Sequence, residues 1–179
     1  GSETINNVIS SQRLAEERVI YFRPALDLPE PDTVLARHTY DIPEDSYVLA
    51  IVGNRLDQEI SDDFCKDMVR LLEYDERIFI LFIGNYDLES GPVKNYSTLY
   101  KQSRCFGFAE NLLTAYTLCD AFLNPPRTGG GYSAAYAMRM GLPVFTLPEG
   151  DAYTIAGNKF VYHSPEDIDG MIKKLRADT

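Results

Sequence analysis

Two continuous apolar runs, residues 47–52 and 78–83, constrain the fold of this 179-residue chain more than any other feature. Both runs are rich in β-branched and aromatic residues, and a Gly-Asn pair comes directly after each of them. Strands without a polar face are typical of a parallel sheet that is covered on both sides. Between the runs, Ser61 can cap a helix whose apolar residues recur at helical spacing. The pattern predicts a β-α-β unit.

The alternation of strand and helix continues to the end of the chain. Further strands are expected at 104–108, 121–124 and 142–147, with a sixth at 159–162, and further helices at 111–119, at 133–140 and from Ser164-Pro165 onward. The polar stretch 87–98 contains Gly-Pro and is expected to be a loop. Strands separated by helices predict a doubly wound, Rossmann-like α/β fold with a parallel sheet. We assign it to a single domain, residues 45–179.

The segment 1–44 is less regular. Gly1 and Ser2 look like the remnant of a cleaved tag, and residues 19–22 can form an extra strand. The rest of the segment is interrupted by prolines, at Pro24, Pro29, Pro31 and Pro43. Because proline removes a backbone donor and disfavours regular structure before it, we expect this segment to be an inter-domain linker.

Charge and cysteine content exclude several classes of function. The net charge is −10 and the pI is about 4.6, whereas nucleic acids and anionic membranes require a basic face. Cys65, Cys105 and Cys119 fit neither a disulfide framework nor a zinc cluster, which favours a reducing, cytoplasmic setting. The two histidines lie far apart and predict no metal site. No apolar run reaches the roughly 20 residues of a transmembrane helix.

The strongest candidate for a binding site is the segment 124–133, between an expected strand and the next helix. In an open parallel sheet, ligands bind at the carboxyl ends of the strands. Three glycines allow the backbone to approach a ligand, and the first amides of the following helix favour phosphate. The candidate binding residues here are Arg127, Thr128, Gly129, Gly130, Gly131, Tyr132 and Ser133. The alternative is a flexible turn without a ligand. The nucleotide loop G-x-x-x-x-G-K-[ST] and the dinucleotide motif G-x-G-x-x-G do not occur.

Two further strand ends are candidates. Gly53, Asn54 and Arg55 come after the first strand, and Arg55 can neutralise a diphosphate or can be a solvated surface arginine. In Phe106-Gly107-Phe108, a glycine between aromatic residues allows a flat base to lie against the backbone near Phe108. A core strand with a close-packing glycine explains that sequence equally well.

These segments together resemble the C-terminal domain of B-fold glycosyltransferases of the retaining group 1 type. The resemblance rests on the Gly-Asn-Arg turn at 53–55, on 105–108, on 119–125, and on the glycine-rich loop that leads into Ala-Met-Arg-Met-Gly-Leu-Pro-Val at 137–144. It extends over about residues 45–176. In that family this domain binds a nucleotide diphosphate-sugar without a metal ion, and an N-terminal domain binds the acceptor. The resemblance therefore implies the donor-binding half of a transferase, folded yet inactive alone, whose catalytic residues are unknown.

The chain departs from the family at two positions. Many retaining members carry glutamates where Thr128 and Tyr136 stand here. A threonine hydroxyl can still form a hydrogen bond with a sugar hydroxyl, but the single hydroxyl of a tyrosine cannot replace the two acceptor oxygens of a carboxylate. We expect Tyr136 to share the ligand-facing side of its helix with Tyr132, since residues four apart lie on one face. The alternative is a core aromatic residue.

Three functions remain open from the sequence. The first is the donor-binding half of an active glycosyltransferase. The second is a related, non-catalytic subunit for acceptor recognition or partner assembly. The third is another nucleotide-binding α/β protein, such as a sugar-nucleotide epimerase.

Overall fold

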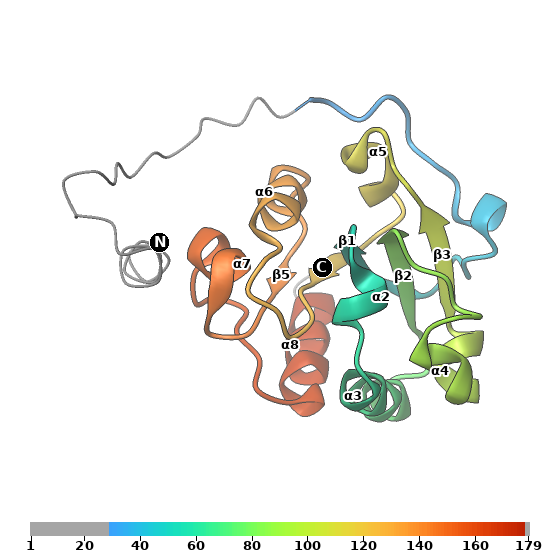
Figure 1. The fold of residues 1–179 in the computed structure, drawn as a ribbon. Helices are drawn as coiled ribbons and strands as arrows, with labels where there is room; N and C mark the ends of the chain where they lie inside the picture. The colour runs from blue at the N-terminus through green and yellow to red at the C-terminus, as the bar shows by residue number, and fades with distance from the viewer. Residues whose placement is uncertain (1–28, 178–179) are drawn as a thin grey trace, which may run out of the picture.

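The computed structural model describes residues 29–177, which form a five-stranded parallel sheet with helices on both faces (Figure 1). The strand order is β3-β2-β1-β4-β5. The strands are β1 (Tyr47–Gly53), β2 (Ile78–Gly84), β3 (Ser103–Gly107), β4 (Ala121–Leu123) and β5 (Val144–Phe145). The helices are η2 (Arg37–Tyr40), α2 (Leu56–Glu59), α3 (Asp62–Tyr74), η3 (Pro92–Asn95), α4 (Ser97–Lys101), α5 (Leu112–Tyr116), α6 (Gly131–Arg139), α7 (Gly150–Ala156) and α8 (Pro165–Ala177). The expected Rossmann-like fold is confirmed.

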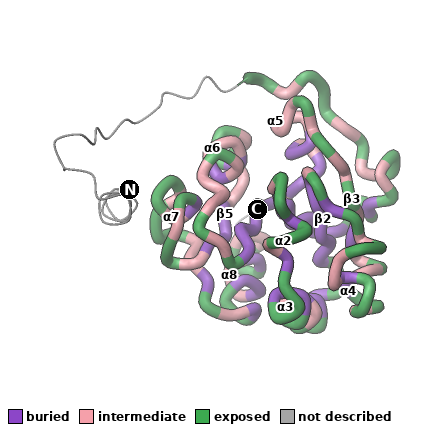
Figure 2. Tube along the Cα trace, in the orientation of Figure 1, coloured by how far each residue is buried: buried purple, intermediate pink, exposed green. Residues whose placement is uncertain are grey.

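β1 and β2 form the centre of the sheet and align without a slip, from Tyr47 opposite Ile78 to Gly53 opposite Gly84. Their apolar residues are buried on both faces. Leu49 and Ile51 belong to one apolar cluster, and Val48 and Ala50 belong to the other. Figure 2 shows these buried strands between the helices. The absence of polar residues from both runs reflects this double coverage.

The two faces are covered by different helices. Residues of α3, α4 and α8 pack into the cluster that contains Leu49, while residues of α5, α6 and α7 pack into the cluster that contains Val48. The predicted cap of α3 is present, because the Ser61 hydroxyl accepts a hydrogen bond from the Phe64 amide at 3.1 Å. Local capping and helical periodicity thus place the long helices correctly.

The last two expected strands are much shorter than predicted. The run 142–147 pairs with β4 only at Val144–Phe145, and the sixth strand at 159–162 is reduced to a single bridge between Thr146 and Val161. Because β5 contains only two residues, it provides few backbone groups with which a further strand could pair. The helix after the glycine-rich loop, expected at 133–140, also starts earlier, at Gly131.

Short helices occupy segments that the sequence indicated as loops. The stretch 87–98 contains η3 and the start of α4, which bury Val93 and Leu99. α2 and α7 were likewise not expected. Elements of one or two turns contain too few residues to show a helical period.

Residues 29–44 run over the surface of the domain, first past α5 and then beside β3, in blue in Figure 1. The amides of Asp32 and Leu35 donate to the hydroxyls of Thr114 and Thr117, at 2.8 and 3.0 Å. Arg37 Nη2 lies 2.7 Å from Asp120 Oδ2. These contacts attach the segment to the domain, while its role as a linker stays a prediction. The possible strand at 19–22 lies outside the described residues.

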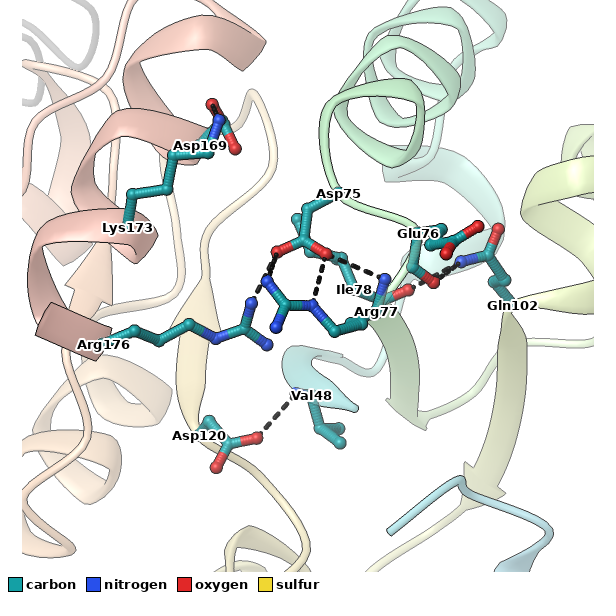
Figure 3. Close-up of polar contacts among 10 residues, drawn as sticks. All are labelled: Val48, Asp75, Glu76, Arg77, Ile78, Gln102, Asp120, Asp169, Lys173 and Arg176. Atoms are coloured by element: carbon teal, nitrogen blue, oxygen red, sulfur yellow. Dashed lines mark hydrogen bonds and ion pairs between the residues drawn. The ribbon is translucent and has the colours of Figure 1, made fainter. Parts of the chain in front are cut away.

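A buried carboxylate ties α3 to α8 at the amino-terminal edge of the sheet (Figure 3). Asp75 comes directly after α3, and its side chain is 6% exposed. Arg77 donates two hydrogen bonds to this carboxylate, from Nε to Oδ1 and from Nη2 to Oδ2, each at 3.0 Å. Arg176 of α8 donates a third, from Nη1 to Oδ2 at 2.5 Å. The hydrogen bonds from Arg77, supported by Arg176, lower the pKa of Asp75 to about 2.

We expect Asp75 to make stability depend on pH in the acid range. Its folded-state pKa lies below the ordinary 3.8, so its contribution is present above about pH 4 and is lost as pH falls toward 2. The shift corresponds to about 2 kcal/mol. In urea titrations, Asp75→Asn should lower the free energy of unfolding by about this amount at pH 7 and by much less near pH 2.5.

Glu73→Gln is the matched control, because Glu73 is an exposed carboxylate in the last turn of the same helix. It should leave the free energy of unfolding unchanged within about 0.5 kcal/mol. Equal destabilisation by Asp75→Asn at both pH values would contradict the assignment.

Candidate functional site

An open cleft of about 840 Å³ lies where β1 and β2 end, at their carboxyl termini. Its lining combines the turn after β1, the segment after β3, the glycine-rich loop, the start of α6, and α7. The lining residues are Val52, Gly53, Asn54, Arg55, Glu59, Ile83, Gly84, Phe108, Ala109, Leu112, Arg127, Gly129, Gly130, Gly131, Tyr132, Ser133, Asp151, Thr154 and Ile155. Parallel α/β proteins bind ligands at this edge of the sheet.

The glycine-rich loop presents backbone to the cleft. Gly130 is the N-cap of α6 in the left-handed region, with φ 97°, and no side chain caps the helix. The first turn contains no acidic residue. A Cβ on Gly129 would meet nothing within 4 Å. The start of α6 therefore presents amides without a side-chain cap to the cleft, an arrangement that favours an anion.

Arg127 lies beneath this loop and holds it to the neighbouring strands. Its side chain is 7% exposed. Nε donates to Asn124 Oδ1 at 2.8 Å, Nη1 to Glu59 Oε2 at 2.6 Å, and Nη2 to the Val52 carbonyl at 2.7 Å. Arg127 thus connects the end of β1, α2 and the segment after β4.

Gly53 is needed for this arrangement. A Cβ at Gly53 would lie 2.7 Å from Arg127 Nη1 and 3.2 Å from Glu59 Oε2. Both of those groups are already fixed by their ion pair. The glycine at the end of β1 therefore leaves space for the buried arginine.

Arg55 is the exposed cation of the cleft. It precedes α2, and its side chain is 73% exposed. Its Nη2 lies 3.6 Å from Glu59 Oε1, so Glu59 faces both arginines. Asp151 of α7 adds a second carboxylate to the lining. Two arginines and two carboxylates leave the lining close to electrically neutral.

Apolar side chains also line the cleft. Beyond β3, Gly107 has φ 81°, and the pairing with β2 shifts between Phe82 and Ile83. The chain then presents Phe108, which is 76% exposed, to the cleft. Tyr132 of α6 and Ile155 of α7 lie in the lining and are also largely exposed.

Two buried tyrosines fix the ends of the loop. Tyr162 donates to the Asn124 carbonyl at 2.7 Å, and Tyr116 donates to the Ser133 carbonyl at 2.9 Å. Burial raises the pKa of both phenols, so each remains a neutral donor. Sequence reasoning did not identify either residue as part of the site.

The structure brings most of the candidate residues together. The candidates that line the cleft are Gly53, Asn54, Arg55, Phe108, Arg127, Gly129, Gly130, Gly131, Tyr132 and Ser133. Thr128 is exposed, does not line it, and accepts a hydrogen bond from the Asp151 amide through its carbonyl.

Tyr136 differs from the expectation. It does not line the cleft and packs instead against the apolar cluster that contains Val48. α6 contributes Gly131, Tyr132 and Ser133 to the lining, all from its first turn. A residue one turn further along lies beyond the rim, so the structure favours the core alternative for Tyr136.

Lining residues that the sequence did not single out include Glu59, Asp151 and Thr154. The spacing of Arg55 and Glu59, four residues apart, is a signal that could have identified Glu59. α7 carries Asp151 and Thr154 to the cleft, and its sequence shows no comparable signal.

Within residues 29–177, no helix has both the length and the apolar character that crossing a bilayer requires. In the same range, no group of three or more His, Cys, Asp and Glu side chains is placed to hold a metal ion.

No protein-family model matches the sequence, and no curated protein matches it significantly. Solved structures do match. A glycosyltransferase of Rickettsia africae has a TM-score of 0.67 at 13% identity, over 97% of this chain and 51% of that one. A mutant O-GlcNAc transferase of Thermobaculum terrenum has a TM-score of 0.59 at 19% identity, over 86% and 33%. HepE of Anabaena, in complex with UDP and glucose, has a TM-score of 0.58 at 15% identity, over 79% and 41%.

These matches confirm that the chain has the fold of one domain of the B-fold glycosyltransferases. Identities this low show the fold alone. The chain spans about a third to a half of the length of these proteins.

Proposed function

We propose that this chain is the donor-binding half of a glycosyltransferase and that its cleft binds a nucleotide diphosphate-sugar. The observation that carries the proposal is the meeting, at one edge of a parallel sheet, of the uncapped start of α6 and the exposed Arg55. Helix-terminal amides and a basic side chain are the groups that stabilise phosphate when no metal ion takes part. We therefore propose that donor binding requires no metal ion.

The walls suit the remaining parts of such a ligand. Phe108 offers an exposed aromatic face for a base, and Ser133 and Thr154 offer hydroxyls for a sugar. HepE, one of the structural neighbours, was solved with UDP and glucose. Uridine diphosphate is therefore the first probe to test.

Transfer requires a second reactant. The matched glycosyltransferases are about two to three times as long as this chain. We therefore propose that a separate N-terminal domain of a longer protein binds the acceptor. A reaction between two substrates needs both held in one geometry. The chain alone should therefore bind a donor without transferring its sugar.

A second candidate function is a non-catalytic relative that uses the fold for recognition or assembly. Two observations favour it. Thr128 and Tyr136 are not carboxylates, and Tyr136 packs against the apolar cluster that contains Val48 and does not line the cleft. In addition, the charges of the lining nearly cancel. This alternative predicts that nucleoside diphosphates do not bind.

We expect Arg55→Ala to weaken the binding of UDP. A charge-assisted hydrogen bond to phosphate contributes about 1–3 kcal/mol, or roughly fivefold to 150-fold in affinity. Calorimetric titration of UDP and GDP into both proteins measures the difference.

The matched control is Arg70→Ala, which removes the same charge from an exposed position on α3 outside the cleft. It should bind UDP like the wild type. Equal affinity of the wild type and Arg55→Ala would remove Arg55 from the site.

A further inference from the structure

Glu59 is a carboxylate placed between the two cationic groups of the cleft. Its side chain is 16% exposed. Oε2 accepts a hydrogen bond from Arg127 Nη1 at 2.6 Å, and Oε1 lies 3.6 Å from Arg55 Nη2. The residue lies in the lining itself, on the short helix after β1.

The two arginines differ in how firmly they are held. Arg127 is 7% exposed and makes three hydrogen bonds, so its guanidinium is fixed beneath the loop. Arg55 is 73% exposed and meets Glu59 at a distance too long for a hydrogen bond. Arg55 can therefore leave Glu59, whereas Arg127 cannot leave without breaking the loop's support.

We propose that Glu59 limits how much more tightly the cleft binds a nucleoside diphosphate than a monophosphate, because its carboxylate competes with the ligand for Arg55. The inference rests on the proposed function. An incoming diphosphate must draw Arg55 away from Glu59, and the loss of that attraction weakens the complex.

Glu59→Gln separates this role from structural support. The amide keeps an oxygen that can accept the hydrogen bond from Arg127, and it removes the charge that attracts Arg55. We expect the variant to bind UDP about threefold to tenfold more tightly than the wild type, since an exposed charge pair is weakened by solvent. UMP lacks the second phosphate, and its affinity should rise by less than about twofold.

Asp57→Asn is the matched control. Asp57 is an exposed carboxylate on the same helix and is not part of the lining. The variant changes the net charge equally, and it should bind UDP and UMP like the wild type. In the Arg55→Ala background, Glu59→Gln should alter UDP affinity by less than about twofold, because the residue for which Glu59 competes is absent.

Calorimetric titrations of UDP and UMP into these variants at low ionic strength test the proposal. Unchanged or weaker UDP binding by a folded Glu59→Gln protein would overturn it, as would a gain that persists without Arg55 or that UMP shares in full. If the wild type does not bind UDP at all, the proposed function itself fails, and the two failures are distinguishable.

A measurement on the wild type covers the case in which Glu59→Gln does not fold. On saturation with UDP, the guanidinium NMR signals of Arg55 should shift while those of Arg127 stay in place. Shifts at both arginines, or at Arg127 alone, would overturn the assignment of Arg55 as the residue that changes partner.

Discussion

Arg127→Ala is expected to destabilise the fold by about 3–5 kcal/mol, because it removes one partner of a buried ion pair. The substitution leaves the Glu59 carboxylate, the Asn124 side-chain oxygen and the Val52 carbonyl without their donors. Asn124 is 2% exposed, so water cannot readily replace the lost bond. Urea unfolding followed by circular dichroism measures the loss.

Arg55→Ala is the matched control for stability. It removes the same kind of side chain next to the same carboxylate, but from a position that is 73% exposed. Exposed pairs contribute little, so its free energy of unfolding should differ from the wild type by no more than about 1 kcal/mol. If the two alanine variants were equally stable, the buried network would not hold the loop.

Gly130→Ala is expected to weaken UDP binding by more than about tenfold, because both the backbone and the space at Gly130 require glycine. Its φ is 97°, and a Cβ would lie well inside van der Waals contact of Asn124 Oδ1 and 3.0 Å from Arg127 Nη2. The N-cap of α6 must then move, and the amides of its first turn lose their placement. Calorimetric titration with UDP measures the loss.

Gly141→Ala provides the control at the other end of the same helix. Gly141 also has a positive φ, of 76°, but a Cβ there would meet nothing within 4 Å. Alanine in the left-handed region should cost about 1–2 kcal/mol of stability. UDP affinity should not change, so a similar loss of binding in both variants would indicate general destabilisation rather than a displaced loop.

The central fold could be predicted from the sequence because its signals are local. β1 and β2 are apolar on both faces, and α3 has a serine cap and an amphipathic face. Such patterns are complete within one segment. α2 and α7 are too short to show a period, and their positions depend on packing against distant parts of the chain.

The candidate site was predictable to the extent that it depends on strand ends. Gly53, Arg55 and the loop 129–131 could be located because parallel strands finish at a common edge. The partners of Arg127 could not be identified from the sequence, since Glu59 and Val52 lie 68 and 75 residues away along the chain. For Arg127, the sequence therefore predicted a binding residue, and the structure adds that its buried guanidinium supports the loop from within the lining.

Tyr136 illustrates the limit of periodicity. Tyr132 and Tyr136 share a helical face, yet Tyr132 lines the cleft and the partly buried Tyr136 packs against an apolar cluster. Helical spacing gives the direction of a side chain around its axis. It does not show where along the helix the cleft ends.

Backbone amide mapping by NMR during titration with UDP, in buffer with a chelator of divalent cations, tests most directly whether the cleft binds a nucleoside diphosphate. We expect saturable shifts at Gly53 and Arg55 and in the segment 129–133, with the amides of α8 unchanged. Saturable shifts on another face of the domain, or no shifts at millimolar UDP, would contradict the proposed donor site.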